Sequence, residues 1–392
     1  MSVFANLPVA EQGTLDTIRR FLARLLSEGL VEAVLVPLET HDGRSVQPAL
    51  VTDPAHMELA NPLLPVIPIS GARMISLVTE RPVDTSNGRP ATALPRIAVV
   101  MRPCELRATV ELSKLRQVRY DQLLTIGVDC VGTYEVTDLK SAGGHPDSYT
   151  AAVLEAAQAA SPDAPGDLPF RHACTICETP VAWNADISLH TIGVDSRQAI
   201  LLELADESLL GPLGLTDGAD TASHRQAVEG LVAARHARRE AELDAVAVQM
   251  RPREDGTPGL IEEFELCQRC HNCTVACPIC YCKECLFRTS TFAHEPRRYM
   301  GWAKRKGAAR LPGDTITFQL TRLSHVTTSC VGCGLCTSAC PAHLPVDTLF
   351  QAVARQTQGI FNYVAGRDIH EPLPVATFQR DELVTLGEVQ RK

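Results

Sequence analysis

Two cysteine runs restrict what this chain can fold into more than any other feature. Each has the spacing C-x2-C-x2-C-x3-C followed by proline: Cys267, Cys270, Cys273, Cys277 with Pro278, and Cys330, Cys333, Cys336, Cys340 with Pro341. The spacing is typical of a pair of [4Fe-4S] clusters, because three thiolates of a tight loop converge on one cluster and the fourth reaches the other. Zinc sites use two C-x2-C pairs, which two runs of four cysteines match poorly.

The spacing also predicts which thiolates share a cluster. The first cluster is expected on Cys267, Cys270, Cys273 and Cys340, and the second on Cys330, Cys333, Cys336 and Cys277. Arg269, inside the first loop, is a cation that would favour the reduced form of its cluster, and a solvated surface charge is the alternative.

Composition limits the class of protein. With 392 residues, two or three domains are expected, and 45% hydrophobic residues exclude a disordered chain. The net charge of −9 argues against a nucleic-acid binder. No apolar run reaches the roughly 18 residues that span a bilayer, and the N-terminus lacks the pattern of a signal peptide. We therefore expect a cytoplasmic protein without a transmembrane segment, in which 15 cysteines serve metal or redox chemistry rather than disulfides.

Before the cysteine runs, apolar strands alternate with amphipathic helices, which predicts an α/β domain with a mostly parallel sheet. Helices are expected at 14–28, 70–80, 104–118, 150–160 and 222–249, strands at 31–39, 96–101 and 123–129, and a hairpin within 185–204. The segment 251–260 holds two prolines and two glycines and is expected to be a linker. An α+β 2[4Fe-4S] ferredoxin-like domain with a long insert is expected at 261–350, where 315–329 reads as a helix, and a C-terminal tail at 351–392.

Three cysteines of the second half fall outside the ferredoxin spacing. Cys280, Cys282 and Cys285 follow the first run closely, and with His294 or His271 they have the composition of a zinc site or a further cluster. Buried or spare thiols are the alternative.

Four cysteines of the first half are candidates for a third cluster. Cys104 follows one predicted strand and Cys130 ends the next, so both are expected at the edge where open α/β sheets place their ligands. Cys174 and Cys177 add a C-x2-C pair and complete a set of four. A zinc site or plain core cysteines fit the same count.

These cysteines lie in motifs that resemble a known family. RPCELRA (102–108), IGVDCVG (126–132) and CTICETPVAWNADI (174–187) are similar to motifs of the coenzyme F-420 hydrogenase/formate dehydrogenase beta-subunit family, over roughly residues 10–205. The resemblance implies that residues 1–250 form an iron–sulfur flavin domain whose cluster cysteines match Cys104, Cys130, Cys174 and Cys177.

The resemblance also implies FAD. The family's first flavin loop corresponds here to EQGTLD, with Gly13 and Thr14, and its second to ISGARM, with Ser70, Gly71 and Arg73. Both stretches are expected to begin helices, whose free N–H groups suit a phosphate. Simple helix caps and a surface arginine are the alternative.

The expected function is that of an oxidoreductase subunit with three [4Fe-4S] clusters, a fourth metal site if the extra cysteines bind one, and FAD. It would pass electrons between a catalytic subunit (formate dehydrogenase, hydrogenase or heterodisulfide-reductase type) and a soluble, flavin-linked carrier. The alternative is a flavin-free iron–sulfur wiring protein inside a larger redox complex.

Overall fold

The computed structural model describes residues 2–79, 96–254, 256, 259–292, 294–307, 313–374 and 376. The chain divides into two compact units. The N-terminal unit holds Met1–Glu240 together with two short returning segments, Val331–Cys333 and Gly366–Glu371. The C-terminal unit holds Ala241–Cys330, Gly334–Ala365 and Pro372–Lys392.

A seven-stranded sheet forms the centre of the N-terminal unit, in the order β1-β7-β6-β5-β4-β2-β3. Its strands are β1 (Val3–Pro8), β2 (Ala33–Glu39), β3 (Val46–Val51), β4 (Ile97–Met101), β5 (Leu123–Val128), β6 (Ile187–His190) and β7 (Ala199–Leu204). The four inner strands β2, β4, β5 and β6 run parallel, whereas β1, β7 and β3 pair antiparallel. Every residue of β4 and β5 is buried, as expected for parallel strands covered on both faces.

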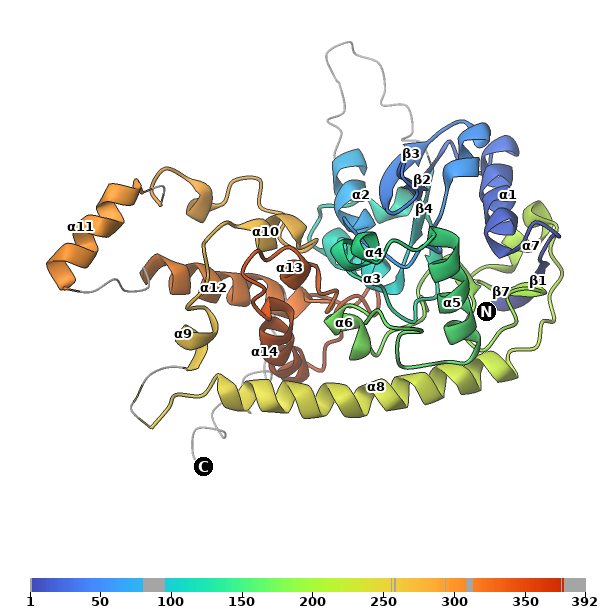
Figure 1. Ribbon diagram of the computed structural model, residues 1–392. Coiled ribbons are helices and arrows are strands. Elements are labelled where there is room, and N and C mark those ends of the chain that lie inside the picture. The colour runs from blue at the N-terminus through green and yellow to red at the C-terminus, as the bar shows by residue number, and fades with distance from the viewer. Residues whose placement is uncertain are drawn as a thin grey trace, which may run out of the picture. The chain divides into compact units, whose positions relative to one another are not determined.

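Helices cover this sheet (Figure 1). They are α1 (Thr14–Ser27), α2 (Gly71–Thr79), α3 (Pro103–Lys114), α4 (Val136–Ala142), α5 (Pro146–Gln158), α6 (His172–Thr175) and α7 (Leu210–Leu213), with 3-10 turns η1 (Pro54–Leu59), η2 (Tyr120–Gln122) and η3 (Glu207–Leu209). An apolar cluster joins α1 to the sheet through Ile18, Leu22 and Leu25, which repeat at helical spacing. The boundary between the two units falls inside α8 (Ala222–Gln249), a single continuous helix.

The described elements of the C-terminal unit are helices, and no strand occurs among its described residues. They are α9 (Gly259–Glu263), α10 (Asn272–Ala276), α11 (Pro296–Lys306), α12 (Gly313–Val326), α13 (Leu335–Ser338) and α14 (Val346–Ile360), with the turns η4 (Leu286–Arg288) and η5 (Thr327–Ser329). The insert between the two cysteine runs supplies α11 and α12. Within this unit, Arg269 contacts both Tyr299 of α11 and Asp314 of α12.

The predicted α/β fold with a mostly parallel sheet is confirmed, and so is the antiparallel hairpin of β6 and β7. The strand β1 was not predicted, because VFANLP is a short, half-exposed edge strand that ends in proline. Parts of three predicted segments lie outside the described residues: residue 80 of the helix 70–80, residues 255, 257 and 258 of the linker, and residues 375 and 377–392 of the tail.

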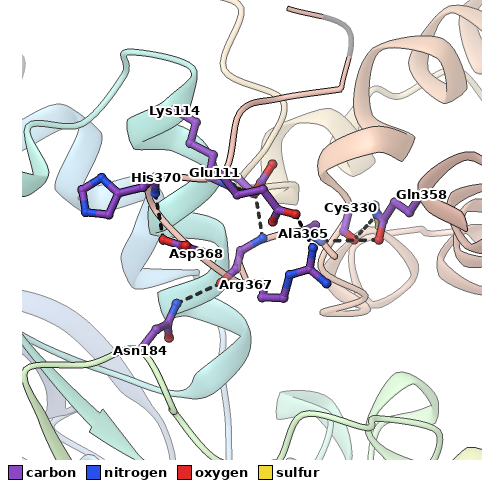
Figure 2. A network of polar contacts seen from close by, with 11 residues as sticks. Glu111, Lys114, Asn184, Cys330, Gln358, Ala365, Arg367, Asp368 and His370 are labelled. Carbon is purple, nitrogen blue, oxygen red and sulfur yellow. Dashed lines mark hydrogen bonds and ion pairs between the residues drawn. The ribbon is translucent and has the colours of Figure 1, made fainter. Parts of the chain in front are cut away.

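One stretch of the expected tail packs on the N-terminal unit. The backbone N–H of Gly366 donates to Glu111 Oε1 at 2.7 Å, and Asn184 Nδ2 donates to the Gly366 carbonyl at 2.9 Å (Figure 2). Glu111 is fully buried and also pairs with Lys114 at 3.4 Å. The segment Gly366–Glu371 therefore completes the polar surroundings of α3 instead of trailing free.

Candidate iron-sulfur sites

Strand register brings the first two N-terminal cysteines to one edge of the sheet. In the parallel pair β4 and β5, Met101 lies opposite Gly127, so both strands end at the same level. Cys104 follows β4 in the first turn of α3, and Cys130 follows β5 after one residue. α3 begins here because Pro103 occupies its first turn and Glu105 Oε2 accepts the N–H of Arg102 at 3.0 Å.

Close packing brings the C-x2-C pair to the same edge. The N–H of Cys130 donates to the carbonyl of Pro180 at 2.8 Å, which ties the loop after Cys177 to the end of β5. A Cβ on Gly127 would lie 2.2 Å from the Cβ of Ala182, so only glycine permits this approach. The glycine of IGVDCVG thus has a packing reason.

Five cysteines line one pocket of the N-terminal unit, which has about 400 Å³ of empty space. Four of them are the predicted set Cys104, Cys130, Cys174 and Cys177, so the structure brings this set together. The fifth is Cys333, which the spacing had placed with the second ferredoxin cluster. Sequence reasoning missed this position, because nothing in a C-x2-C-x2-C spacing shows which other segment the loop touches.

Two buried arginines give this pocket a positive character. Arg235 is fully buried and donates to the carbonyl oxygens of Val131 and Cys177, while its Nε has no partner. Arg171 is 3% exposed and pairs with Glu135, and its Nη1 also has no partner. A buried cation is costly unless an anion compensates it. A [4Fe-4S] cluster with four thiolates carries net negative charge, so the residues of this pocket fit such a cluster.

Burial also changes the protonation of the thiols in this pocket. Burial raises the pKa of Cys104 well above its usual value, and burial also raises the pKa of Cys174 although the charge of Arg171 opposes it. Without metal these sulfurs keep their protons. A metal centre that replaces the protons would offset the free-energy cost of burying thiolates, so metal binding would be coupled to folding.

A second pocket lies at the ends of β2, β4 and β5 and has about 480 Å³ of empty space. Its lining is mostly apolar, and its polar side chains include Arg102, Glu105 and Asn61. Arg102 also donates from Nη1 to the Sγ of Cys130 at 3.4 Å, and Ile67 lines both pockets. The second pocket is thus a direct neighbour of the cysteine pocket, at the edge where open α/β sheets bind ligands.

Of the residues expected to hold a flavin phosphate, Gly71 lines this second pocket. Its N–H donates to Glu105 Oε1 at 2.6 Å, so a carboxylate already occupies the start of α2. Ser70 is 2% exposed and its Oγ has no partner, and the N–H of Arg73 donates to the Ser70 carbonyl at 3.1 Å.

Gly13 and Thr14 are placed elsewhere. Gly13 has a φ of 96° and caps α1, and the Thr14 hydroxyl donates to the carbonyl of Ser196 at 2.6 Å. Neither residue is among the described lining of the two pockets. Their role in flavin binding stays a prediction.

In the C-terminal unit, the structure gathers the first ferredoxin set around Cys273. Burial raises the pKa of Cys273 to about 11, and the thiols of Cys267, Cys270 and Cys340 add to the rise while Arg322 opposes it. Gln319 Nε2 lies 3.5 Å from Cys267 Sγ. Arg269 pairs with Asp314 and Tyr299.

The cysteines predicted for the second ferredoxin cluster do not all face the same surroundings. Gln358 Nε2 donates to the carbonyl of Cys330 at 3.0 Å and so fixes the start of its loop (Figure 2). Cys277 and Cys336 lie near enough to the Arg322 guanidinium for their charge to act on it, whereas Cys333 lines the N-terminal pocket. Both ligand sets therefore approach Arg322.

The three extra cysteines lie together. Burial raises the pKa of Cys280 to about 12, with further contributions from Cys277, Cys282 and Cys285. The two histidines considered as additional ligands pack on aromatic rings, His271 on Phe318 and His294 on Tyr299 and Trp302. A metal site on these cysteines stays a prediction.

The comparisons with known proteins agree with this chemistry. Residues 324–344 match the family model of the 4Fe-4S binding domain, which confirms the predicted ferredoxin-like region. The chain is 24% identical over 323 residues to the F420-dependent formate dehydrogenase subunit beta of Methanocaldococcus jannaschii, covering 73% of this chain and 77% of that protein. It is 26% identical over 304 residues to the F420-dependent formate dehydrogenase 1 subunit beta of Methanococcus maripaludis, covering 71% and 74%. These matches confirm the resemblance to the beta-subunit family.

Among solved structures, a chain of the F420-reducing [NiFe] hydrogenase complex from Methanosarcina barkeri aligns with a TM-score of 0.41 and 13% identity, over 62% of this chain and 92% of that chain. In the described part of the chain, none of the helices has the length and apolar character needed to cross a membrane.

Proposed function

We propose that this chain is the electron-transfer iron–sulfur subunit of a multi-subunit oxidoreductase. It passes electrons between a catalytic subunit of formate dehydrogenase, hydrogenase or heterodisulfide-reductase type and a flavin-linked soluble carrier. Support comes from the two relatives, which are named as beta subunits of F420-dependent formate dehydrogenases. The catalytic chemistry itself belongs to the partner subunit.

One observation carries the proposal: four cysteines from three separate segments converge on a pocket that contains unpartnered N–H groups of two buried arginines. Glu135 compensates the charge of Arg171, but no carboxylate pairs with Arg235 among the described residues, and an uncompensated buried cation raises the free energy of the folded state. A cluster bound there supplies one-electron chemistry. The protein contributes thiolates that hold it, arginines that balance its charge, and an apolar wall that excludes water.

The neighbouring apolar pocket is where we propose that FAD binds. Arg102 stands between this pocket and Cys130, so a flavin ring in the pocket would lie within a few side-chain lengths of the cluster. When bound, FAD exchanges single electrons for a hydride. The residues of the chain would orient the ring and keep water out.

The flavin-free wiring protein remains a second candidate because of Glu105. Its carboxylate accepts the first N–H of α2, where a phosphate was expected, and like charges repel. Acid extraction of anaerobically purified protein distinguishes the two candidates: released flavin supports the first, and an iron–sulfur absorption shoulder without flavin supports the second.

Iron and acid-labile sulfide analysis of the full chain, purified without oxygen, tests the main proposal. Three clusters predict about twelve irons per chain, and a filled fourth site would bring the number to about sixteen. The variant Cys104→Ser should lose about four irons and one reduced-cluster signal in electron paramagnetic resonance (EPR). A wild-type value near eight, unchanged in Cys104→Ser, would remove the N-terminal cluster.

A further inference from the structure

One arginine of the C-terminal unit is placed among the cluster cysteines without a carboxylate partner. Arg322 lies on α12 and is 4% exposed. Its Nη1 donates to the Sγ of Cys273 at 3.1 Å and to Gln319 Oε1 at 3.1 Å, and its Nη2 donates to the carbonyl of Cys273 at 3.3 Å. The guanidinium is thus anchored directly on a ligand of the predicted first ferredoxin cluster.

The surroundings of this guanidinium are dry. The Phe350 ring centre lies 4.6 Å from its Cζ and the Phe318 ring centre lies 5.7 Å away, while Nε is buried without a partner. No ion pair with a carboxylate occurs for Arg322 among the described residues. Arginine keeps its charge in proteins, so this buried cation requires an anion nearby.

The candidate anions are cysteine thiolates of both ferredoxin sets. Besides Cys273 of the first set, Cys277 and Cys336 of the second set lie within electrostatic range of the guanidinium. In the protonated state these thiols would leave the cation uncompensated. Ligation to iron turns them into thiolates and resolves the imbalance.

Arg269 provides the contrast. It lies in the first cluster loop, between Cys267 and Cys270, and was the cation expected to act on that cluster. In the structure it pairs with Asp314 and with the Tyr299 hydroxyl, so its charge is compensated locally. The uncompensated cation is Arg322, which lies far from the first cysteine run in the sequence and which the sequence analysis did not identify.

We propose that Arg322 is the shared counter-charge of the two ferredoxin clusters and raises the reduction potential of both. The inference rests on the proposed function, because it requires that both clusters are present. Reduction adds one electron to a cluster and increases its negative charge, and a nearby buried cation stabilises that state. The hydrogen bond to Cys273 Sγ acts on the first cluster in addition to the charge. We therefore expect Arg322 to raise the reduction potential of the first cluster more than that of the second.

The test is an EPR-monitored redox titration of the full-length, anaerobically purified holoprotein with dithionite as reductant. Arg322→Gln should lower the potentials of both ferredoxin clusters, the first by more, with iron content unchanged. We expect the ratio of reduced to oxidised first cluster at a fixed potential to fall about tenfold, because a charged hydrogen-bond donor to its ligand sulfur is lost.

Two further variants keep the result decisive. Arg269→Gln is the matched control, because it removes an arginine from the cluster loop whose charge Asp314 already balances, and it should change the ratio much less. Arg322→Lys keeps the charge and should give intermediate potentials. If Arg322→Gln loses iron, full iron and normal EPR signals in Arg322→Lys would support the counter-charge role. An equal loss of iron in Arg322→Lys would overturn that role.

The failure of this inference differs from the failure of the proposed function. Wild-type protein without the two ferredoxin signals would contradict the proposed function. Wild-type protein with full iron, combined with unchanged potentials in Arg322→Gln or with an equal shift in Arg269→Gln, would contradict the role of Arg322 alone.

Discussion

Arg102 donates a hydrogen bond from Nη1 to the Sγ of Cys130, across 3.4 Å. The same guanidinium donates from Nη2 to the carbonyl oxygens of Leu64 at 2.6 Å and Pro62 at 3.2 Å, and the residue is 7% exposed. One side chain therefore connects Cys130, a predicted cluster ligand, with the wall of the apolar pocket. Hydrogen bonds to cluster sulfurs are one of the means by which a protein sets a reduction potential.

The first prediction concerns this arginine. Arg102→Gln should lower the potential of the N-terminal cluster, because a charged donor to Cys130 is lost. It should also lower the free energy of unfolding by about 1–3 kcal/mol, since the carbonyls of Pro62 and Leu64 lose their partner. Redox titration and urea unfolding measure the two effects. An unchanged potential in a variant with full iron would show that the contact with Cys130 has no influence on the cluster.

The second prediction compares two cysteines of the same run. Cys333 lines the N-terminal pocket, and Cys336 is not among its described lining residues. Both serine variants should lose the second ferredoxin cluster. Only Cys333→Ser should also alter the EPR spectrum or potential of the N-terminal cluster, because it replaces a thiolate beside Cys104 and Arg171.

The two variants control each other, since they are the same chemical change three residues apart. If Cys336→Ser disturbs the N-terminal cluster as much as Cys333→Ser does, then the effect comes from loss of the second cluster and not from the position of Cys333. Flavin content should remain the same in both.

The contrast between these cysteines shows how far sequence reasoning extends. The runs 96–101 and 123–129 were recognisable as buried strands because they are continuously apolar, and parallel pairing then places Cys104 and Cys130 at one edge. The placement of Cys333 and the choice between Arg269 and Arg322 were not predictable. They depend on which distant segments touch and on whether a carboxylate such as Asp314 lies nearby, and neither property leaves a local pattern.

The third prediction concerns the flavin. If a phosphate of FAD binds at the start of α2, Arg73→Glu places a repelling charge there and should lower FAD occupancy several-fold, with iron unchanged. Arg20→Glu is the control, because Arg20 is an exposed arginine of α1 that pairs with Asp16. Acid-released flavin per iron is the measurement. Equal flavin in both variants would move the phosphate away from Ser70–Arg73.

The last prediction comes from a buried group that the sequence did not reveal. His190 is 2% exposed, and its Nδ1 lies 3.1 Å from Asp129 Oδ1 while its Nε2 lies 3.3 Å from Glu203 Oε2. The ring of His224 packs against it at a tilt of 37°, with ring centres 4.2 Å apart, and the Nδ1 of His224 lies 2.8 Å from the Ile192 carbonyl. A histidine between two carboxylates is expected to be a cation.

Burial by itself lowers the pKa of His190, but Asp129 and Glu203 outweigh burial and raise it from 6.5 to about 9. Burial and the charge on His190 lower the pKa of His224, which favours its neutral form. Because the folded state raises the pKa of His190, its stabilisation is complete below about pH 6.5 and disappears as the pH rises through about 9. The rise corresponds to about 3 kcal/mol.

His190→Gln should therefore lower the free energy of unfolding by about 3 kcal/mol at pH 6, and the difference from wild type should shrink towards pH 10. Urea unfolding followed by circular dichroism at a series of pH values measures it on the holoprotein. His236→Gln is the control, because His236 pairs with Glu178 on the surface, where ion pairs contribute little. A loss in His190→Gln that is the same at pH 6 and pH 10 would mean that His190 stabilises the fold by packing and not by its charge.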